Sequence, residues 1–485
     1  MKNFNPYRNQ IVGIEQTFNS PDGEKRLIYA DWTASGRLYR PIEEYLINHL
    51  GPFVANPHTE TTMSGIRMTE AYHQAQQIIK RHVHANDDDA IFFAGFGMTA
   101  VINKLQRLLG IRVPENLCPR PNCQKNIKPL VIITHMEHHS NQTSWNECCC
   151  DVEIIRRADN GLPDLEHLEE ILAANSNREL LIGSFSACSN VTGIHTPYAA
   201  MAAAMHRHGG YCFVDFAASA PYVKIDMHPS DPQQRLDAIF FSPHKFLGGP
   251  GSSGVMVLNK ELYHNRIPDH PGGGTVLWTN PWGEQYYYED IEIREDGGTP
   301  GYLQAIRAAL AVLLKEHMGI ENILAREEEL KCLLLEKLCL HPQVVVLEAG
   351  QLNRLGIISF YSLHHHHNLI VQLLNDRFGI QSRGGCSCAG TYGHILLNVE
   401  REQSRHITDM INHGDLSTKP GWVRISLHPT MNEAEVTAMA EAVHIVMDNY
   451  DRWQQDYVFI PKTGEFRHRT WKKQTDDLRG DFKPC

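Results

Sequence analysis

Short apolar runs alternate with amphipathic segments over the first half of the chain. The runs are too short for helices and several are rich in Val, Ile and Phe, so they predict buried strands. They occupy residues 90–94, 131–135, 180–186, 211–216, 238–242 and 254–258. Helical patterns over residues 99–109, 165–174 and 197–208 lie between them. This alternation predicts a large, doubly wound, mostly parallel α/β sheet.

The pattern changes after residue 267. Residues 268–301 are rich in Gly, Pro and Trp, which predicts a long loop, and long loops in compact domains are often functional. Residues 302–340 favour long helix because Ala, Leu, Glu and Lys predominate. A second α/β pattern follows, with strands expected at 357–361 and 422–427 and helices expected at 369–378 and from Asn432.

These changes divide the 485 residues into five parts. We expect an N-terminal segment, a large sheet domain, connecting helices, a small C-terminal α+β domain, and a polar tail that lies at the periphery. The expected bounds are 1–28, 29–301, 302–343, 344–450 and 451–485.

Composition narrows the range of functions. The formal net charge is -11, and an acidic balance argues against nucleic-acid binding. The longest apolar run, residues 308–314, is too short to span a bilayer, and residues 1–9 lack the apolar stretch of a signal peptide. We therefore expect a cytoplasmic protein with no membrane or nucleic-acid partner and with reduced thiols.

Two His and Cys patterns resemble metal sites only superficially. Consecutive histidines, as in residues 364–367, cannot all face one ion, so we expect a solvated loop there. Cys118 and Cys123 have no second Cys or His pair at zinc spacing and are expected to be structural. We therefore predict no metal site.

A lysine follows one of the predicted strands. Lys245 stands at the carboxyl end of the sheet, where doubly wound folds bind their ligands. A partly buried lysine amine is nucleophilic and condenses with an aldehyde. Ser242 and His244 flank it with donors that suit a phosphate. Most lysines are solvated surface groups, so Lys245 alone is a weak signal.

Two further elements strengthen this interpretation. Asp215 ends another apolar strand, where it is either a turn residue or the partner of a pyridine nitrogen. Gly97, Met98 and Thr99 open a helix after a strand, and such a helix N-terminus binds phosphate through free N–H groups. A tight strand-to-helix turn would need the same glycines. Together the elements predict a pyridoxal-phosphate (PLP) enzyme.

A nicotinamide-dependent oxidoreductase is the main alternative. Residues 95–100 match the dinucleotide fingerprint G-x-G-x-x-A, which requires an acidic residue about 20 positions on, at the end of the next strand. Here that distance falls in a loop, residues 113–123, and the next strand begins only at 131. Lys245 and Asp215 therefore favour PLP over a dinucleotide.

Several motifs together resemble a known family. The segments YADWTAS (29–35), EHHSN (137–141) and SNVTG (189–193), with the lysine, aspartate and glycine motifs in order, are similar to the class V aminotransferase family of fold-type I PLP enzymes. The resemblance extends from residue 29 to residue 447. Within the family, the cysteine desulfurases and selenocysteine lyases are the most similar.

The resemblance implies a role for each matching residue. Lys245 carries the cofactor as a Schiff base, Asp215 binds the pyridine nitrogen, and His138 stacks on the ring and carries protons. Asn190 binds the phenolic oxygen. The remaining cofactor contacts are Gly97, Met98, Thr99, Ser242 and His244.

The resemblance also implies a substrate site and a dimer. Arg424 grips the carboxylate of a small amino-acid substrate, with Ala34 and Arg383 beside it; such a grip suits a planar guanidinium. Thr299 is similar to a residue that reaches the phosphate of the neighbouring subunit, which implies a homodimer with shared active sites.

The segment RGGCSCAG (383–390) implies which reaction the family member catalyses. Counting from Arg383 places Cys388 at the position of the desulfurase thiol, which takes sulfur from cysteine as a persulfide and passes it to an acceptor protein; Cys386 is the alternative. Two departures leave other reactions open. Ala218 replaces the usual Gln, and a long loop, 390–420, follows the motif. The alternatives are transamination, another PLP lyase reaction, and a non-catalytic relative.

Overall fold

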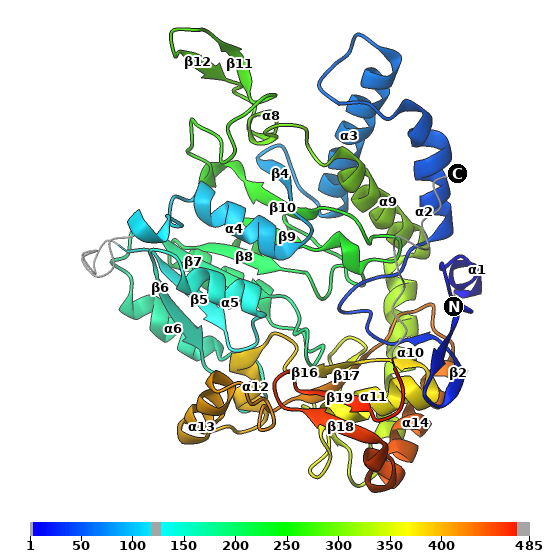
Figure 1. Ribbon diagram of the computed structural model, residues 1–485. Coiled ribbons are helices and arrows are strands. Elements are labelled where there is room, and N and C mark those ends of the chain that lie inside the picture. The colour runs from blue at the N-terminus through cyan, green and yellow to red at the C-terminus, as the bar shows by residue number, and fades with distance from the viewer. Residues whose placement is uncertain (1–2, 118–127, 473–485) are drawn as a thin grey trace.

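A seven-stranded sheet forms the centre of the larger part of the molecule. The computed structural model describes residues 3–117 and 128–472. The strand order is β4-β10-β9-β8-β7-β5-β6, and only β10 runs antiparallel to its neighbours (Figure 1). The bounds are β4 (Asp89–Ala94), β5 (Leu130–Thr134), β6 (Asp151–Ile155), β7 (Leu181–Ser186), β8 (Tyr211–Asp215), β9 (Ala238–Phe241) and β10 (Gly254–Asn259).

The mostly parallel sheet confirms the expected α/β fold. All six predicted strands form, and β6 is the one that the apolar pattern missed. This edge strand is largely exposed and carries Asp151 and Glu153, so it leaves no apolar run in the sequence. An edge strand with charges is typical of sheets that avoid pairing with other chains.

Helices cover both faces of this sheet. One face packs against α4 (Met98–Leu108) and α5 (His139–Asn146). The other face packs against α3 (Met63–His82), α6 (Leu165–Ala174), α7 (Tyr198–Arg207) and α9 (Tyr302–Met318). Because both faces are covered, the inner strands are largely buried and read as continuous apolar runs.

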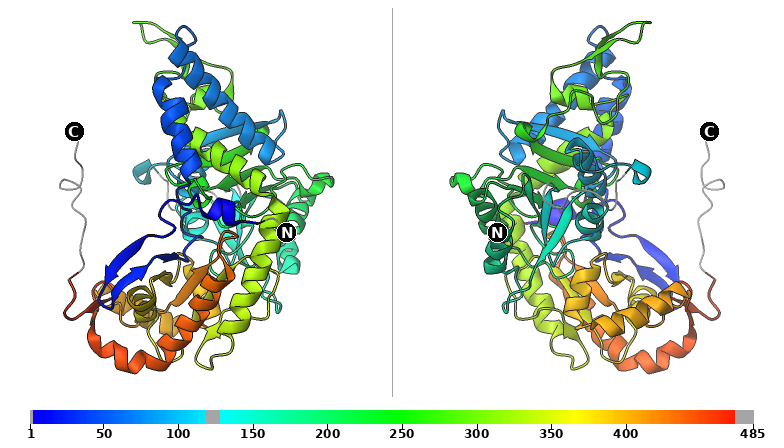
Figure 2. Two further views of the ribbon diagram at one scale, coloured as in Figure 1. Left: turned by 90° about the vertical axis from the view of Figure 1, so that its right-hand side faces the viewer. Right: turned by 90° about the vertical axis from the view of Figure 1, so that its left-hand side faces the viewer.

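The long helix expected over residues 302–340 is two helices. The chain turns at Gly319, whose φ of +81° lies in the region that favours glycine, and α10 (Ile320–Leu338) follows. The α9–α10 pair runs along one side of the molecule from the large sheet to a smaller one (Figure 2), where α10 packs against α14 (Glu433–Trp453).

The smaller sheet has four antiparallel strands in the order β13-β14-β17-β16. Both predicted strands and both predicted helices of this part form, and Asn432 caps α14 as part of a capping box with Glu435. The bounds are β13 (Val345–Val346), β14 (Ile357–Tyr361), β16 (Arg383–Gly385), β17 (Trp422–Ser426) and α11 (His367–Phe378).

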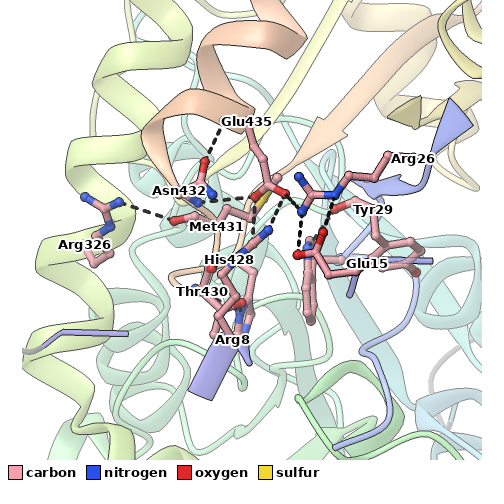
Figure 3. A network of polar contacts seen from close by, with 11 residues as sticks. Arg8, Glu15, Arg26, Tyr29, Arg326, His428, Thr430, Met431, Asn432 and Glu435 are labelled. Carbon is pink, nitrogen blue, oxygen red and sulfur yellow. Dashed lines mark hydrogen bonds and ion pairs between the residues drawn. The ribbon is translucent and has the colours of Figure 1, made fainter. Parts of the chain in front are cut away.

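The N-terminal segment packs against this smaller part. Glu435, in the first turn of α14, accepts hydrogen bonds from Arg8 at 2.8 and 2.5 Å and from Arg26 at 3.2 Å, and Arg26 also pairs with Glu15 (Figure 3). The elements of the segment are α1 (Asn5–Arg8), β1 (Thr17–Ser20), β2 (Gly23–Arg26), and β3 (Ile28–Tyr29), which pairs with β15 (Ile380–Gln381); α2 (Arg40–Tyr45) follows.

Part of the expected tail is also packed rather than peripheral. α14 continues to residue 453, and β18 (Tyr457–Ile460) and β19 (Glu465–His468) form a hairpin against α11. Tyr457 is buried, and its hydroxyl donates to Asp376 at 2.8 Å. Aromatic side chains in a polar segment hide this packing from a composition argument.

The His run is a solvated loop only in its first half, where His364 is exposed and precedes the helix. His366 caps α11 through a hydrogen bond from the Asn368 N–H, and its ring contacts Phe459 and Phe466. His367 is buried at the first position of the helix. The run therefore starts a helix under the C-terminal hairpin. Cys118 and Cys123 lie outside the described residues.

Two segments expected to be loops contain regular structure. Residues 268–301 include a hairpin of β11 (Val276–Thr279) and β12 (Gln285–Tyr287) and the helix α8 (Ile291–Glu295). Residues 390–420 include α12 (Gly390–Leu396) and α13 (Arg401–Asn412). No side chain of α13 is buried, so the pattern of core residues could not reveal it. In the described ranges, no helix is long and apolar enough to cross a membrane.

Candidate active site

A cavity of 840 Å³ lies between the carboxyl ends of the large-sheet strands and the edge of the small sheet. It brings together most of the site residues expected from the sequence. They are Ala34, Gly97, Met98, Thr99, His138, Asn190, Asp215, Ser242, His244, Lys245, Arg383, Cys388 and Arg424. Cys386 and Thr299 do not line it.

Lys245 enters the cavity from a short turn after β9. Its backbone N–H donates to the Ser242 carbonyl at 3.0 Å, which fixes the turn. Burial lowers the pKa of Lys245 to about 8, although the charge of Asp215 raises it in part. A lysine with this pKa is neutral in a substantial fraction near pH 8, which makes it a nucleophile.

Asp215 ends β8 on the same side of the cavity. Its Oδ1 accepts a hydrogen bond from the Ala217 N–H at 2.8 Å, and no group within residues 3–117 and 128–472 hydrogen-bonds its Oδ2. Burial raises the pKa of Asp215 to about 7, which the Ala217 hydrogen bond and the charge of Lys245 oppose. A buried carboxylate with a free oxygen suits a protonated ring nitrogen.

The N-terminus of α4 opens onto the other end of the cavity. Gly97 caps the helix without a side chain, and the Met98 N–H donates to Ser242 Oγ at 2.8 Å. A Cβ at Gly97 would lie 3.1 Å from Ser242 Oγ, so glycine keeps this approach open. Free N–H groups of a helix terminus bind phosphate, and burial lowers the pKa of the adjacent His244 to about 4, which keeps it neutral.

His138 lies at the start of α5. Its Nδ1 accepts the Ser140 N–H at 3.1 Å, which leaves the proton of the neutral imidazole on Nε2. Burial and the charge of Lys245 lower the pKa of His138 to about 4. The preceding residue, Glu137, is buried and accepts hydrogen bonds from Thr134, Asn141 and Ser186, which anchors this corner of the sheet.

Two arginines of the small sheet share one carboxylate. Arg383 and Arg424 are direct partners on β16 and β17, and Asp31 lies between them. Asp31 Oδ1 accepts from Arg424 Nη2 at 2.7 Å, and Oδ2 accepts from Arg383 Nε at 2.9 Å. Facing like charges repel, so Asp31 stabilises both side chains at the cavity wall. Asp31 was not among the site residues expected from the sequence, although it lies within the family-like segment 29–35.

Asn190 reaches the cysteine motif. Its Nδ2 donates to the Ser387 carbonyl at 2.7 Å, and its own carbonyl accepts from Arg424 at 2.9 Å. Its Oδ1 is buried and has no protein partner among the described residues. The side-chain amide of Asn190 thus binds the segment that carries the thiols, and the backbone carbonyl of the same residue binds Arg424.

The two thiols of the motif have different environments. Cys388 is exposed and lines the cavity. Cys386 is half-buried and packs against an apolar cluster that includes Trp422 and Tyr392. In an extended strand two residues this far apart would point the same way, but Ser387 and Cys388 have φ values of +50° and +57°, and only Cys388 lines the cavity.

A third thiol, Cys188, lines the cavity and was not expected. Its Sγ donates to the Gly193 carbonyl at 3.0 Å, and burial raises the pKa of this thiol well above its usual value. A thiol held protonated in this way is a poor nucleophile. Ala218, at the position where the sequence departs from the family pattern, also lines the cavity.

The comparison with protein families agrees with this geometry. The model of the family described as "Aminotransferase class-V" matches residues 28–439. The chain belongs to this family. Its members are PLP-dependent enzymes, and the nicotinamide alternative is thereby excluded.

Curated relatives carry a more specific name. A probable cysteine desulfurase from Halalkalibacterium halodurans is 28% identical over 371 residues, which cover 75% of this chain and 84% of the relative. A probable cysteine desulfurase from Staphylococcus epidermidis is 28% identical over 382 residues, covering 78% and 85%.

Solved structures share the fold. The apo structure of a cysteine desulfurase from Thermococcus onnurineus superposes with a TM-score of 0.72 at 20% identity and covers 93% of this chain and 99% of that one. A cysteine desulfurase from Escherichia coli gives 0.70 at 21% identity, covering 92% and 99%. The fold of this family member is therefore that of the fold-type I PLP enzymes.

Proposed function

We propose that this family member removes sulfur from cysteine or a close analogue, with Cys388 as the acceptor thiol. The observation that carries the proposal is that Lys245 and Cys388 line one cavity although they come from different sheets. A transaminase or another lyase needs the lysine but has no use for an exposed thiol at this place.

The described residues fit PLP. Lys245 would hold it covalently, Asp215 would accept the ring N–H, and the N-terminus of α4 with Ser242 and His244 would bind its phosphate. When bound, PLP accepts the electrons released at the substrate Cα. The free Oδ2 of Asp215 and the glycine-lined helix terminus support this fit.

The substrate carboxylate would bind Arg424. This guanidinium has a buried Nε without a protein partner in the described part of the chain, and Asp31 holds it in place. Arg383, half-exposed beside it, adds a second positive charge at the same wall. Both arginines orient a small amino acid with its side chain toward Cys388.

Two groups would move protons. When it is not bonded to the cofactor, Lys245 Nζ would take the Cα proton, because its lowered pKa leaves it partly neutral near pH 8. His138 is neutral with its proton on Nε2, so it would pass that proton on only as its Nδ1, which lies 3.1 Å from Ser140 Oγ, takes one up.

Sulfur transfer then needs only the thiolate. Cys388 Sγ attacks the substrate sulfur, the new S–S bond forms, and the Cβ–S bond breaks with its electron pair left on the substrate carbon. Protonation of that carbon gives alanine. Cysteine and the Cys388 thiol thus give alanine and a Cys388 persulfide, with no added oxidant or reductant.

One experiment tests the reaction. The purified protein, supplied with PLP and a reducing agent, is incubated with L-cysteine, and alanine and sulfide are measured. We expect both in equal amounts. Conversion of an added amino acid and keto acid without sulfide would indicate transamination instead. If the protein catalyses neither reaction, the result would favour a non-catalytic relative.

A second experiment tests the cofactor link. The protein should show a visible absorption band, and borohydride reduction should attach the cofactor to the peptide that contains Lys245. A colourless protein that takes up no PLP would contradict the proposal.

We further propose a homodimer that contributes Thr299 to the neighbouring active site. Thr299 is exposed and lies away from its own cavity, which supports a role in another subunit. Sedimentation should give a dimer, and a fully active monomer would contradict this. Transfer to a sulfur acceptor protein and a cytoplasmic location remain predictions, as do the five expected chain segments.

A further inference from the structure

The segment that carries the candidate thiol has an unfavourable backbone. Ser387 and Cys388 have φ values of +50° and +57°, in the left-handed region that non-glycine residues rarely occupy. Two consecutive residues in this region persist only where surrounding contacts hold them. We call residues 386–390 the Cys388 loop.

Four hydrogen bonds hold the Cys388 loop. Two act on Ser387: Asn190 Nδ2 donates to its carbonyl at 2.7 Å, and Trp422 Nε1 donates to its hydroxyl at 3.2 Å. The other two involve His139. Its backbone N–H donates to the Cys388 carbonyl at 2.8 Å, and its Nε2 accepts the Gly390 N–H at 2.9 Å.

His139 thus contacts the chain on both sides of Ala389. It is the first residue of α5 and directly follows His138, which lines the cavity. Because His139 is held in α5, its contacts fix the position of the Cys388 thiol relative to the residues of the large-sheet wall. A Cβ at Gly390 would lie 3.1 Å from His139 Nε2, closer than ordinary contact, so glycine permits this approach.

We propose that His139 is a positioning residue that holds the Cys388 loop in its left-handed conformation, so that the thiol faces the substrate sulfur. The role in sulfur transfer rests on the proposed function, whereas the hold on the loop does not. His139 does not line the cavity and touches no reacting atom. Its neutral imidazole is an acceptor, in keeping with burial that lowers the pKa of His139.

Two variants of His139 separate the hydrogen bond from packing. His139→Ala removes the acceptor, whereas His139→Gln supplies a side-chain carbonyl that can accept the Gly390 N–H. The control is Thr391→Val, which removes the hydrogen bond between Thr391 and Gln142 in the same contact of α5 with α12. Gly390→Ala disturbs the contact from the other side and serves if His139→Ala fails to fold.

Amide hydrogen exchange of the peptide spanning residues 386–393 reports the hold directly. In His139→Ala we expect the Gly390 amide to exchange about tenfold faster, because the loss of one hydrogen bond lowers the free energy of local opening by an amount that corresponds to this factor. His139→Gln should restore most of the protection, and Thr391→Val should leave Gly390 unchanged. Exchange in β17 is the internal reference.

Turnover reports the consequence for the reaction. Alanine formation at saturating L-cysteine should fall about tenfold in His139→Ala with little change in KM, because the carboxylate contacts remain. Wild-type exchange at Gly390 in His139→Ala, or no recovery in His139→Gln, would overturn the proposal. If the wild type forms no alanine but the differences in amide exchange appear, the role of His139 in holding the loop is supported and the proposed sulfur transfer is contradicted.

Discussion

The two walls of the cavity are built in different ways. On the large-sheet wall, Lys245 and Asp215 follow strand ends, and burial is the main cause of their shifted pKa values. On the small-sheet wall, Arg424 and Cys388 depend on specific partners, namely Asp31 for the arginine and His139 for the backbone of the thiol.

The two walls therefore contribute to the reaction in different ways. The large-sheet wall holds groups whose proton affinity is tuned by their surroundings, as in many active sites. The small-sheet wall holds groups whose ordinary chemistry suffices once they are placed correctly. Changes on the first wall should abolish turnover and cofactor binding, whereas changes on the second should reduce turnover and leave the cofactor bound.

The largest effect is expected at Lys245. Lys245→Ala should remove the visible absorption band and lower turnover by at least about 1000-fold, because the covalent link and the base are lost together. Absorption spectra and alanine formation check this. Lys224→Ala, an exposed lysine, is the control. An intact absorption band in Lys245→Ala would show that the cofactor is linked to another amine.

The next largest effect separates the two thiols. Cys388→Ala should keep the visible band but lower alanine formation from L-cysteine by about 100-fold or more, since no thiolate takes the sulfur. Cys386→Ala should stay close to the wild type because this thiol faces an apolar cluster. The reverse outcome would assign the reaction to Cys386, and full activity in both would exclude persulfide chemistry.

A smaller loss is expected at Arg424. Arg424→Ala should lower kcat/KM about 100-fold through both constants, because charge and orientation are lost. Asp31→Asn keeps the guanidinium but weakens its support, so the loss should be about tenfold. Steady-state kinetics with L-cysteine measure both. An unchanged kcat/KM in Arg424→Ala would remove this residue from the substrate site.

The smallest effect is a pH dependence on the large-sheet wall. Capture of PLP by the apoenzyme needs neutral Lys245, so its rate should rise with pH, with a midpoint near pH 8 instead of the 10.5 of a free lysine, and level off above that midpoint. Asp215→Asn should shift this midpoint to lower pH, because the Asp215 charge raises the pKa of Lys245. Stopped-flow absorbance follows the capture, and a rate still rising above pH 10 would contradict burial of the amine.

Most of the fold and the residues of the large-sheet wall could be predicted from the amino-acid sequence. Buried parallel strands are continuous apolar runs, and ligand groups follow them directly, so Lys245, Asp215 and Gly97 stand beside their signals in the chain. The exposed edge strand β6 and the exposed helix α13 escaped prediction because neither buries enough apolar surface to leave a pattern.

The small-sheet wall, in contrast, depends on contacts between segments that lie far apart in the chain. The Asp31 carboxylate meets Arg383 and Arg424 across more than 350 residues of chain, and no local pattern encodes that distance. The same holds for the choice between Cys386 and Cys388, which share one small-residue motif although only Cys388 lines the cavity. Side-chain direction and long-range hydrogen bonds arise only when both sheets pack around the cavity, so the residues that orient the reaction could not be assigned from sequence alone.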